Sequence, residues 1–370
     1  YFTDAHGLGI KDADVHPKVS EHMGEIIAII QKLVEGGFAY NKDGNVYYRV
    51  GAFKTYGRLS KQSIEDLMSG ARVEVNDEKE NPLDFALWKK RKEGEPYWDS
   101  PWGEGRPGWH IECSAMSQKY LGDTIDIHGG GQDLVFPHHE NEIAQSEAAS
   151  GHPFVRYWVH NGYINVDNVK MSKSLGNFFT IRDISKKFDL EVVRMFILSA
   201  HYKSPINFSD ESLMHAQGGL ERLYNVKKDL QFRMEHTKNE ALTAEEKAWT
   251  AHLADYAAAF DEAMEDDINT ANALSSLFEL AKDINVFVTD QTSLAALKEA
   301  QRIFMNLADV LGLLTKKDEL LDEDIQKLID ERQEARARKD FKRSDEIRDL
   351  LKERGITLED TREGVKWKRN

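Results

Sequence analysis

The sequence predicts an α/β protein: an α/β core with a mixed insertion, then an α-helical bundle and a small α/β C-terminal domain. Three observations predict it. Residues 123–151 run from an alternating strand pattern through three glycines into a helix. Residues 212–314 contain four long stretches with apolar side chains at helical spacing, and residues 320–368 show two helices before a hairpin. At 370 residues, the chain also exceeds the roughly 250–300 residues that one hydrophobic core usually supports.

Composition and charge indicate which binding partners and which cellular compartment to expect. The net charge of -15 argues against nucleic acid, but residues 331–370 carry 13 basic and 10 acidic side chains, a surplus of +3. The only cysteine cannot form an internal disulfide, so we expect a reducing compartment, the cytoplasm. The longest apolar run, residues 26–30, is far below the ~20 residues of a membrane helix, and we expect no membrane association.

The first hundred residues predict the mixed insertion. Residues 1–13 have the glycines and aspartates of a loop, and residues 19–35 are amphipathic and end at two glycines, as a helix does. The turn sequence at 41–45 between β-favouring runs predicts a hairpin. A short helix is expected at 61–70 and irregular structure at 73–81.

Residues 100–109 are rich in glycine and proline, and they lead to a predicted helix at 110–121 that carries Cys113. Trp109 lies at the junction. Its large ring fits a packed loop and the aromatic wall of a pocket equally well.

Three residues in this region could bind one metal ion. After the strand at 123–128 and a glycine bend at 129–131, Pro137 suits the first position of a helix, which places His138 and Glu142 on one face. Cysteine, histidine and glutamate are all zinc ligands, and three of them leave a position open. The alternative is a small buried Cys113, a helix-start histidine and a solvated glutamate.

Two predicted strands, 154–159 and 162–166, lead into a loop at 169–177 that contains two lysines, two serines and a glycine. Lysine is a compact charge suited to β- and γ-phosphates, so Lys173 could stabilise a leaving pyrophosphate. The alternative is an ordinary solvated loop. A helix is expected at 186–195 and a loop at 198–207.

The sequence from residue 212 onward predicts helices, and its C-terminal end predicts a surface that contacts RNA. Helices at 212–237, 244–264, 270–289 and 294–314 would form the bundle. Helices at 320–339 and 341–354 precede a hairpin of residues 356–359 and 365–368. The interleaved basic and aromatic side chains there suit unstacked bases and phosphates, although charged helix faces are usually only solvated.

These motifs together resemble class I aminoacyl-tRNA synthetases, and most closely the cysteinyl-tRNA synthetases. The resemblance rests on KMSKS at 170–174, GWHIECSAM at 108–116 and HGGGQDLVFPHHENEIAQSE at 128–147. It continues through 100–109, through 266–281 and to TREGVKWKR at 361–369. The family's HIGH motif and a further zinc-ligand cysteine are absent from the sequence, and we expect activation chemistry to need them.

The resemblance implies a site and its substrates. Cys113, His138 and Glu142 would bind one Zn²⁺ per chain, which selects the thiolate of cysteine. Lys173 and Lys170 would be the catalytic lysines that meet the phosphates of ATP, with Mg²⁺. Trp109 would lie against the amino acid, and Gly131 and Asp133 near the adenylate. The partners would be tRNA(Cys), cysteine and ATP, and the protein would be a monomer.

The resemblance also implies a domain order. We expect a remnant of the N-terminal catalytic core at 1–20, a connective insertion at 21–104 and the second half of a partial Rossmann-type core, with the zinc site, at 105–153. A stem-contact region with the KMSKS loop at 154–214, a helical bundle at 215–316 and an anticodon-binding domain at 317–370 would follow. Two rival functions remain: a mycothiol-pathway cysteine ligase, and a non-catalytic tRNA-binding fragment.

Overall fold

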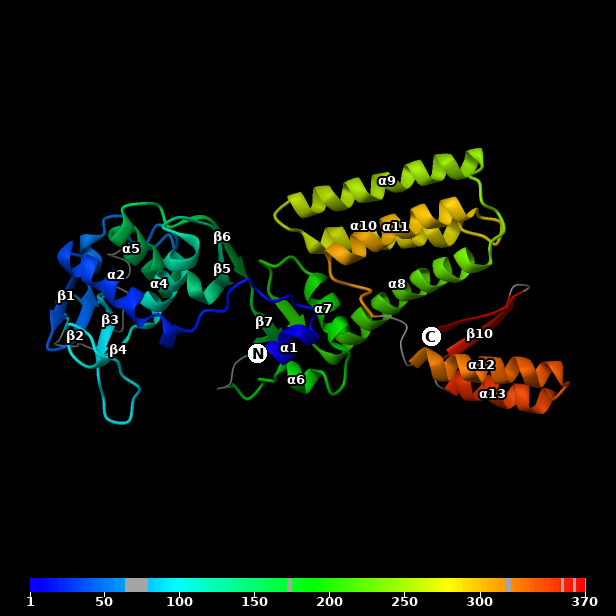
Figure 1. Ribbon diagram of the computed structural model, residues 1–370, viewed down its shortest axis with the longest axis horizontal. Coiled ribbons are helices and arrows are strands. Elements are labelled where there is room, and N and C mark those ends of the chain that lie inside the picture. Colours follow the sequence, from blue (N-terminus) through cyan, green and yellow to red (C-terminus); the bar gives the residue numbers. More distant parts are fainter. Residues whose placement is uncertain (64–78, 172–174, 317–320, 354–355, 362–363, 370) are drawn as a thin grey trace. The chain divides into compact units, whose positions relative to one another are not determined.

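The structure, a computed structural model, describes residues 1–63, 79–171, 175–316, 321–353, 356–361 and 364–369. The chain divides into two compact units, Asp12–Tyr163 and the combination of Tyr1–Lys11 with Ile164–Asn370 (Figure 1). The predicted helix at 61–70 and the irregular stretch at 73–81 lie mostly outside the described residues.

The unit Asp12–Tyr163 begins with a helix and an antiparallel sheet. Helix α2 spans Met23–Glu35, shorter than predicted because a separate 3-10 turn forms at Val19–Glu21. The predicted hairpin is confirmed: Asp43 and Gly44 both have positive φ (52° and 91°), which suits a two-residue hairpin turn. The sheet has the order β1-β2-β3-β4, and its strands are Ala39–Lys42, Asn45–Tyr48, Phe85–Lys90 and Gly105–Pro107.

The second part of this unit is a strand–helix–strand repeat. Helix α4 (Trp109–Leu121) precedes β5 (Ile125–Gly131), and α5 (Glu140–Ser150) connects β5 to the parallel strand β6 (Val155–Asn161). The predicted glycine bend is wrong: Gly129–Gly131 continue β5 because they pair with Val159–Asn161 of β6. After a 3-10 turn at Gln132–Leu134, Phe136 is extended and a π turn at Val135–His139 leads into α5.

One hydrophobic core joins these parts. Ile26, Ile30 and Leu33 of α2 pack with Tyr48 and Trp88 of the sheet, and Ile111 of α4 and Ala144 of α5 belong to the same cluster. The Tyr48 hydroxyl donates to the Ala144 carbonyl at 2.9 Å. Helix α2 and the four-stranded sheet therefore support the two helices that carry Cys113 and Glu142.

Glu140, at the start of α5, holds the loop at residues 57–60. Its carboxylate is fully buried and accepts backbone N–H groups from Gly57 (2.9 Å), Leu59 (3.1 Å) and Ser60 (2.9 Å). Such charge-assisted bonds are strong, and an amide in the same place would turn a donor toward these donors.

We therefore expect Glu140→Gln to lower the free energy of unfolding of this unit by on the order of 3 kcal/mol. Urea unfolding followed by tryptophan fluorescence measures this. The exposed Glu93→Gln is the matched control, expected to change the stability by less than about 0.5 kcal/mol. Equal stabilities of the two variants would contradict the role assigned to Glu140.

In the other unit, a small mixed sheet comes before the bundle. Strand β7 (Ile164–Val166) pairs antiparallel with β8 (Val169–Lys170) and parallel with β9 (Ile206–Phe208). Short helices α1 (Phe2–Gly7) and α6 (Ile181–Ile184) and helix α7 (Leu190–Leu198) belong to the same unit. Three predictions are wrong here: residues 1–13 contain a helix, the loop at 198–207 contains most of β9, and α7 begins four residues after 186.

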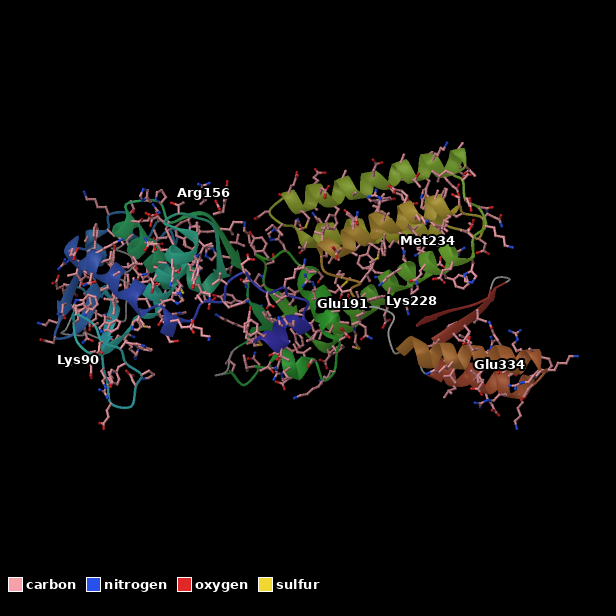
Figure 2. All side chains as sticks on the ribbon, in the orientation of Figure 1. Lys90, Arg156, Glu191, Lys228, Met234 and Glu334 are labelled. Carbon is pink, nitrogen blue, oxygen red and sulfur yellow. The ribbon has the colours of Figure 1, made fainter. Side chains whose placement is uncertain are left out.

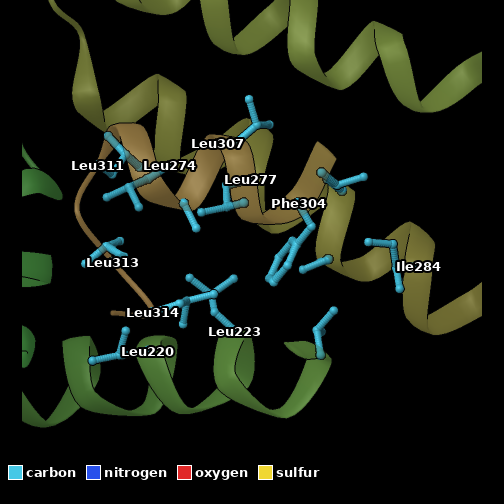
Figure 3. Packing of buried hydrophobic residues seen from close by; sticks show 14 of the residues in the cluster. Leu220, Leu223, Leu274, Leu277, Ile284, Phe304, Leu307, Leu311, Leu313 and Leu314 are labelled. Carbon is cyan, nitrogen blue, oxygen red and sulfur yellow. The ribbon is translucent and has the colours of Figure 1, made fainter. Parts of the chain in front are cut away.

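The four-helix prediction is confirmed. Helices α8 (Asp210–His236), α9 (Ala244–Glu265), α10 (Thr270–Phe287) and α11 (Leu294–Val310) share one apolar core (Figure 1). Figure 3 shows leucines from several segments meeting around Phe304, among them Leu223, Leu277 and Leu314.

The C-terminal part has the predicted order. Helices α12 (Leu321–Ala337) and α13 (Phe341–Glu353) precede a hairpin of β10 (Ile356–Thr361) and β11 (Gly364–Arg369). Ile329, Ile347, Leu351 and Ile356 form its core. Charged side chains such as Lys90, Arg156 and Glu334 are exposed (Figure 2). None of the described helices is both long and apolar enough to cross a lipid bilayer.

Candidate metal centre

Three side chains from three elements converge in the unit Asp12–Tyr163. Cys113 comes from α4, His138 from the π turn and Glu142 from α5. One potential ligand atom of each lies within 4.8 Å of the others, and His138 Nε2 is 3.7 Å from Glu142 Oε2. The sequence spacing thus predicted correctly that His138 and Glu142 lie close together.

Glu142 is a buried carboxylate among three imidazoles: the Nε2 atoms of His128, His138 and His139 lie 3.2, 3.7 and 3.8 Å from its Oε2. Its side chain is fully buried, and neither carboxylate oxygen accepts a hydrogen bond from the part of the chain that the structure describes. A buried carboxylate without compensation is costly. The donor set of a thiol, an imidazole and a carboxylate therefore fits a divalent cation.

Three of the neighbouring imidazoles favour the neutral form. Burial, followed by the adjacent His138, lowers the pKa of His110 to about 4. Burial, followed by repulsion from His128, lowers the pKa of His139 to about 3. Burial also lowers the pKa of His138, although Glu142 opposes the shift. Neutral imidazoles are the form that binds metals.

Cys113 holds its proton at neutral pH. Burial, followed by the charges of Glu142 and Glu112, raises the pKa of its thiol to about 12. Binding of a metal would displace that proton, since only the thiolate is a good ligand.

A histidine neighbour orients the proposed ligand. The Nδ1 atoms of His110 and His138 are 2.8 Å apart, so one ring donates to the other and the Nε2 of His138 faces Glu142. Hydrogen bonds of this kind commonly select the ligating nitrogen of a histidine. His139 is held in the same way, with its Nδ1 2.8 Å from His160 Nε2.

A second possible ligand set, missed in the sequence, shares Glu142. Ligand atoms of His128, His139 and Glu142 also lie within 4.8 Å of one another, with His128 Nε2 3.2 Å from Glu142 Oε2. Gly130 makes room for it, because a Cβ there would lie 2.8 Å from His139 Cε1. Two features of the sequence could have indicated this second set: His128 directly before the three glycines, and the adjacent histidines His138 and His139.

The other predicted residues of this unit lie around the cluster. Trp109 is 58 % exposed, and its ring centroid is 4.4 Å from that of His138. Gly131 ends β5, and the Asp133 carboxylate lies against the position that a Cβ on Gly131 would occupy. Trp109 is the first residue of α4 and is largely exposed, so it is not packed in a loop.

Of the two predicted lysines, the structure describes Lys170. Lys170 is an exposed residue of β8 in the other unit, where its carbonyl accepts from Asn177 Nδ2 at 3.3 Å. Lys173 lies outside the described residues.

Sequence families match almost the whole chain. Residues 1–218 match the family described as "tRNA synthetases class I (C) catalytic domain". Residues 259–315 match the "DALR domain", and residues 318–367 match the "Cysteinyl-tRNA ligase anticodon binding domain".

Individual proteins agree with these families. The chain is 57 % identical to "Cysteine--tRNA ligase" of Clostridioides difficile (strain 630), with 100 % of the chain and 80 % of the relative covered. It is 56 % identical to the protein of the same name from Anoxybacillus flavithermus (strain DSM 21510 / WK1), over 100 % of the chain and 79 % of that relative.

Among solved structures, the chain resembles Mycobacterium tuberculosis methionyl-tRNA synthetase bound by methionyl-adenylate. The TM-score is 0.58 at 14 % identity, over 84 % of this chain and 77 % of that one. A putative arginyl-tRNA synthetase from Campylobacter jejuni has a TM-score of 0.57 at 13 % identity, over 85 % and 66 % of the two chains. At such identities the likeness concerns the fold alone, and it confirms the predicted α/β class.

Proposed function

The chain belongs to the cysteine–tRNA ligases, a family of class I aminoacyl-tRNA synthetases, and from this premise we propose how its residues divide the work. The identity of 57 % over all 370 residues carries the assignment. The family matches on both the catalytic and the anticodon-binding segments support tRNA as a partner, with an amino acid and ATP as substrates.

The reaction has two steps. The carboxylate of cysteine attacks the α-phosphate of ATP, so that cysteinyl-adenylate forms and pyrophosphate leaves. A hydroxyl of the terminal adenosine of tRNA(Cys) then attacks the carbonyl carbon, and AMP leaves. Neither step needs a covalent bond to the enzyme, so the protein acts through positioning and charge stabilisation.

Cys113, His138 and Glu142 would hold a zinc ion. When bound, zinc supplies a soft Lewis acid that a thiolate ligates better than a hydroxyl does, which would separate cysteine from serine. The buried Glu142 carboxylate, whose oxygens accept no hydrogen bond from the described residues, supports this. A thiolate is a softer zinc ligand than any donor in the set of His128, His139 and Glu142. Trp109 would cover the amino acid.

The lysines would serve the nucleotide. Lys173, with Lys170 in the same motif, would meet the phosphates of ATP and its Mg²⁺, and Gly131 and Asp133 would lie near the adenylate. We propose that residues 318–367 bind the anticodon of the tRNA. We also propose that the protein is a monomer in the cytoplasm.

Charging assays test the assignment. We expect the full-length enzyme to attach cysteine to a tRNA(Cys) transcript and to discriminate strongly against serine. Transfer of cysteine to an amino-sugar acceptor with tRNA left uncharged would instead identify the mycothiol-pathway ligase. Binding of tRNA with no cysteine-dependent ATP–pyrophosphate exchange would identify a non-catalytic tRNA-binding protein.

A further inference from the structure

The segment that leaves the bundle toward the C-terminal domain is held through its backbone. Residues 311–316, the exit strap, follow α11. Arg194 Nε donates to the carbonyl of Leu311 at 2.7 Å, and Lys227 Nζ donates to the carbonyls of Leu314 and Lys316, both at 3.1 Å. Three carbonyls of the strap are thus bound by side chains of α7 and α8.

The amide groups of the strap are held as well. Glu191 Oε1 accepts from the N–H of Thr315 at 3.3 Å, and the Tyr224 hydroxyl accepts from the N–H of Lys316 at 3.2 Å. Tyr224 in turn donates to Glu191 Oε2 at 2.7 Å, which closes the network, and Lys316 forms an ion pair with Asp189. Glu191, labelled in Figure 2, is 6 % exposed and comes from α7.

The strap is also pinned by apolar packing and by its backbone conformation. Leu313 and Leu314 are 1 % and 2 % exposed and belong to the cluster that contains Leu220 and Leu223 of α8 (Figure 3). Leu314 has φ +60°, which costs a residue with a side chain roughly 1–2 kcal/mol. Such a conformation persists only where the surroundings impose it.

This degree of restraint exceeds what an ordinary connection has. Loops usually run over the surface with their backbone groups in water. Here five backbone groups are bound by four side chains that lie far away in the sequence. The restraint fixes the path of the chain from Leu311 to Lys316, where it leaves the bundle.

Helix α7, which binds the exit strap, also packs against the small sheet that contains Lys170. Phe196 of α7 meets Phe208 of β9 edge to face, with ring centroids 6.0 Å apart. Strand β9 pairs with β7, and β7 pairs with β8, which contains Lys170. The exit strap and the strand that contains Lys170 are therefore both connected to helix α7, the strand through β7 and β9.

We propose that Glu191, Tyr224 and Lys227 are positioning residues for tRNA, acting through the exit strap. This rests on the proposed function: one tRNA must reach the C-terminal domain and the catalytic part together. A strap held in one direction prepares the C-terminal domain for binding. A loose strap would have to be ordered by each incoming tRNA, and that entropy would be lost from affinity.

The test is the double variant Tyr224→Phe/Lys227→Met in the full-length enzyme. Removing three hydrogen bonds to the strap is expected to raise the KM for full tRNA(Cys) about 10-fold, at an unchanged kcat. Cysteine-dependent ATP–pyrophosphate exchange and charging of an acceptor-stem minihelix without an anticodon should stay at the wild-type level. Tyr224→Phe/Lys227→Arg keeps a cationic donor at position 227 and should return the KM most of the way toward the wild-type value. The exposed Lys247→Met on α9 is the matched control.

A readout independent of tRNA separates this proposal from the assigned function. Trypsin cleavage after Lys316, identified by mass spectrometry, should be faster in the double variant than in the wild type and in Lys247→Met. Failure of the wild type to charge tRNA would overturn the function, whereas unchanged cleavage would overturn the strap. An unchanged KM for tRNA, or an equal loss in exchange and minihelix charging, would also overturn the positioning role. If the double variant does not fold, Tyr224→Phe alone is compared in the same assays, with a smaller KM effect expected.

Discussion

Replacing Cys113 by alanine is expected to reduce bound zinc from about one ion per chain to a small fraction of that. The thiolate is the strongest zinc ligand of the candidate set, and His138 and Glu142 alone leave two positions of a tetrahedral site unfilled. The metal content is measured by mass spectrometry of the purified protein after dialysis against a weak chelator. The full-length variant should also lose on the order of 100-fold of its preference for cysteine over serine.

Two matched variants make this prediction sharp. Cys113→Ser keeps the volume and places a hydroxyl where the thiol was, so it should lose zinc as well. His139→Gln alters the alternative set only and should retain zinc, because His139 is not among the three proposed ligands. Stoichiometric zinc in Cys113→Ala together with its loss in His139→Gln would move the metal to His128, His139 and Glu142.

The sequence was most informative where structure is local. The hairpin at Asp43–Gly44 and the amphipathic helices of the bundle depend on neighbouring residues, and both are confirmed. The errors depend on distant partners. Helix α1 is stabilised by the burial of Ala5 and by the ion pair of Asp4 with Arg182. The glycines 129–131 look like a bend until β6 pairs with them.

The sequence contains information that could have corrected the predicted start of one helix. Helix α7 begins after Asp189, whose carboxylate accepts from the backbone N–H of Glu191 at 2.9 Å. Aspartate is a preferred N-cap residue, so the capping chemistry could have placed the start correctly.

The candidate metal centre was predictable in its donors and not in its surroundings. The spacing of His138 and Glu142 on a helix indicates a common face, but only the packing of α4 on α5 brings Cys113 to them. The burial of Glu142 and the contact of His110 with His138 arise from the packing of the unit Asp12–Tyr163. Such environment effects involve residues up to a hundred positions apart.

In the full-length enzyme, Lys173→Ala is expected to slow cysteine-dependent ATP–pyrophosphate exchange by about 10²–10³-fold. A positive group that meets the phosphates acts most strongly as negative charge develops on the leaving pyrophosphate, and removal of one such stabilising group typically costs this much. Since the lysine would not contact cysteine, the KM for cysteine and the zinc content should stay near the wild-type values. The combination separates a lost phosphate contact from a damaged metal centre.

Charge and hydrogen-bonding geometry can be distinguished at the same position. Lys173→Arg keeps the charge on a wider, planar group, so it should recover part of the lost rate, whereas Lys173→Gln should not. Lys89→Ala, an exposed lysine of β3, is the matched control and should leave the exchange rate unchanged. Normal exchange by Lys173→Ala would show that Lys173 does not stabilise the pyrophosphate. The charge would then have to come from Mg²⁺ or from other cationic side chains.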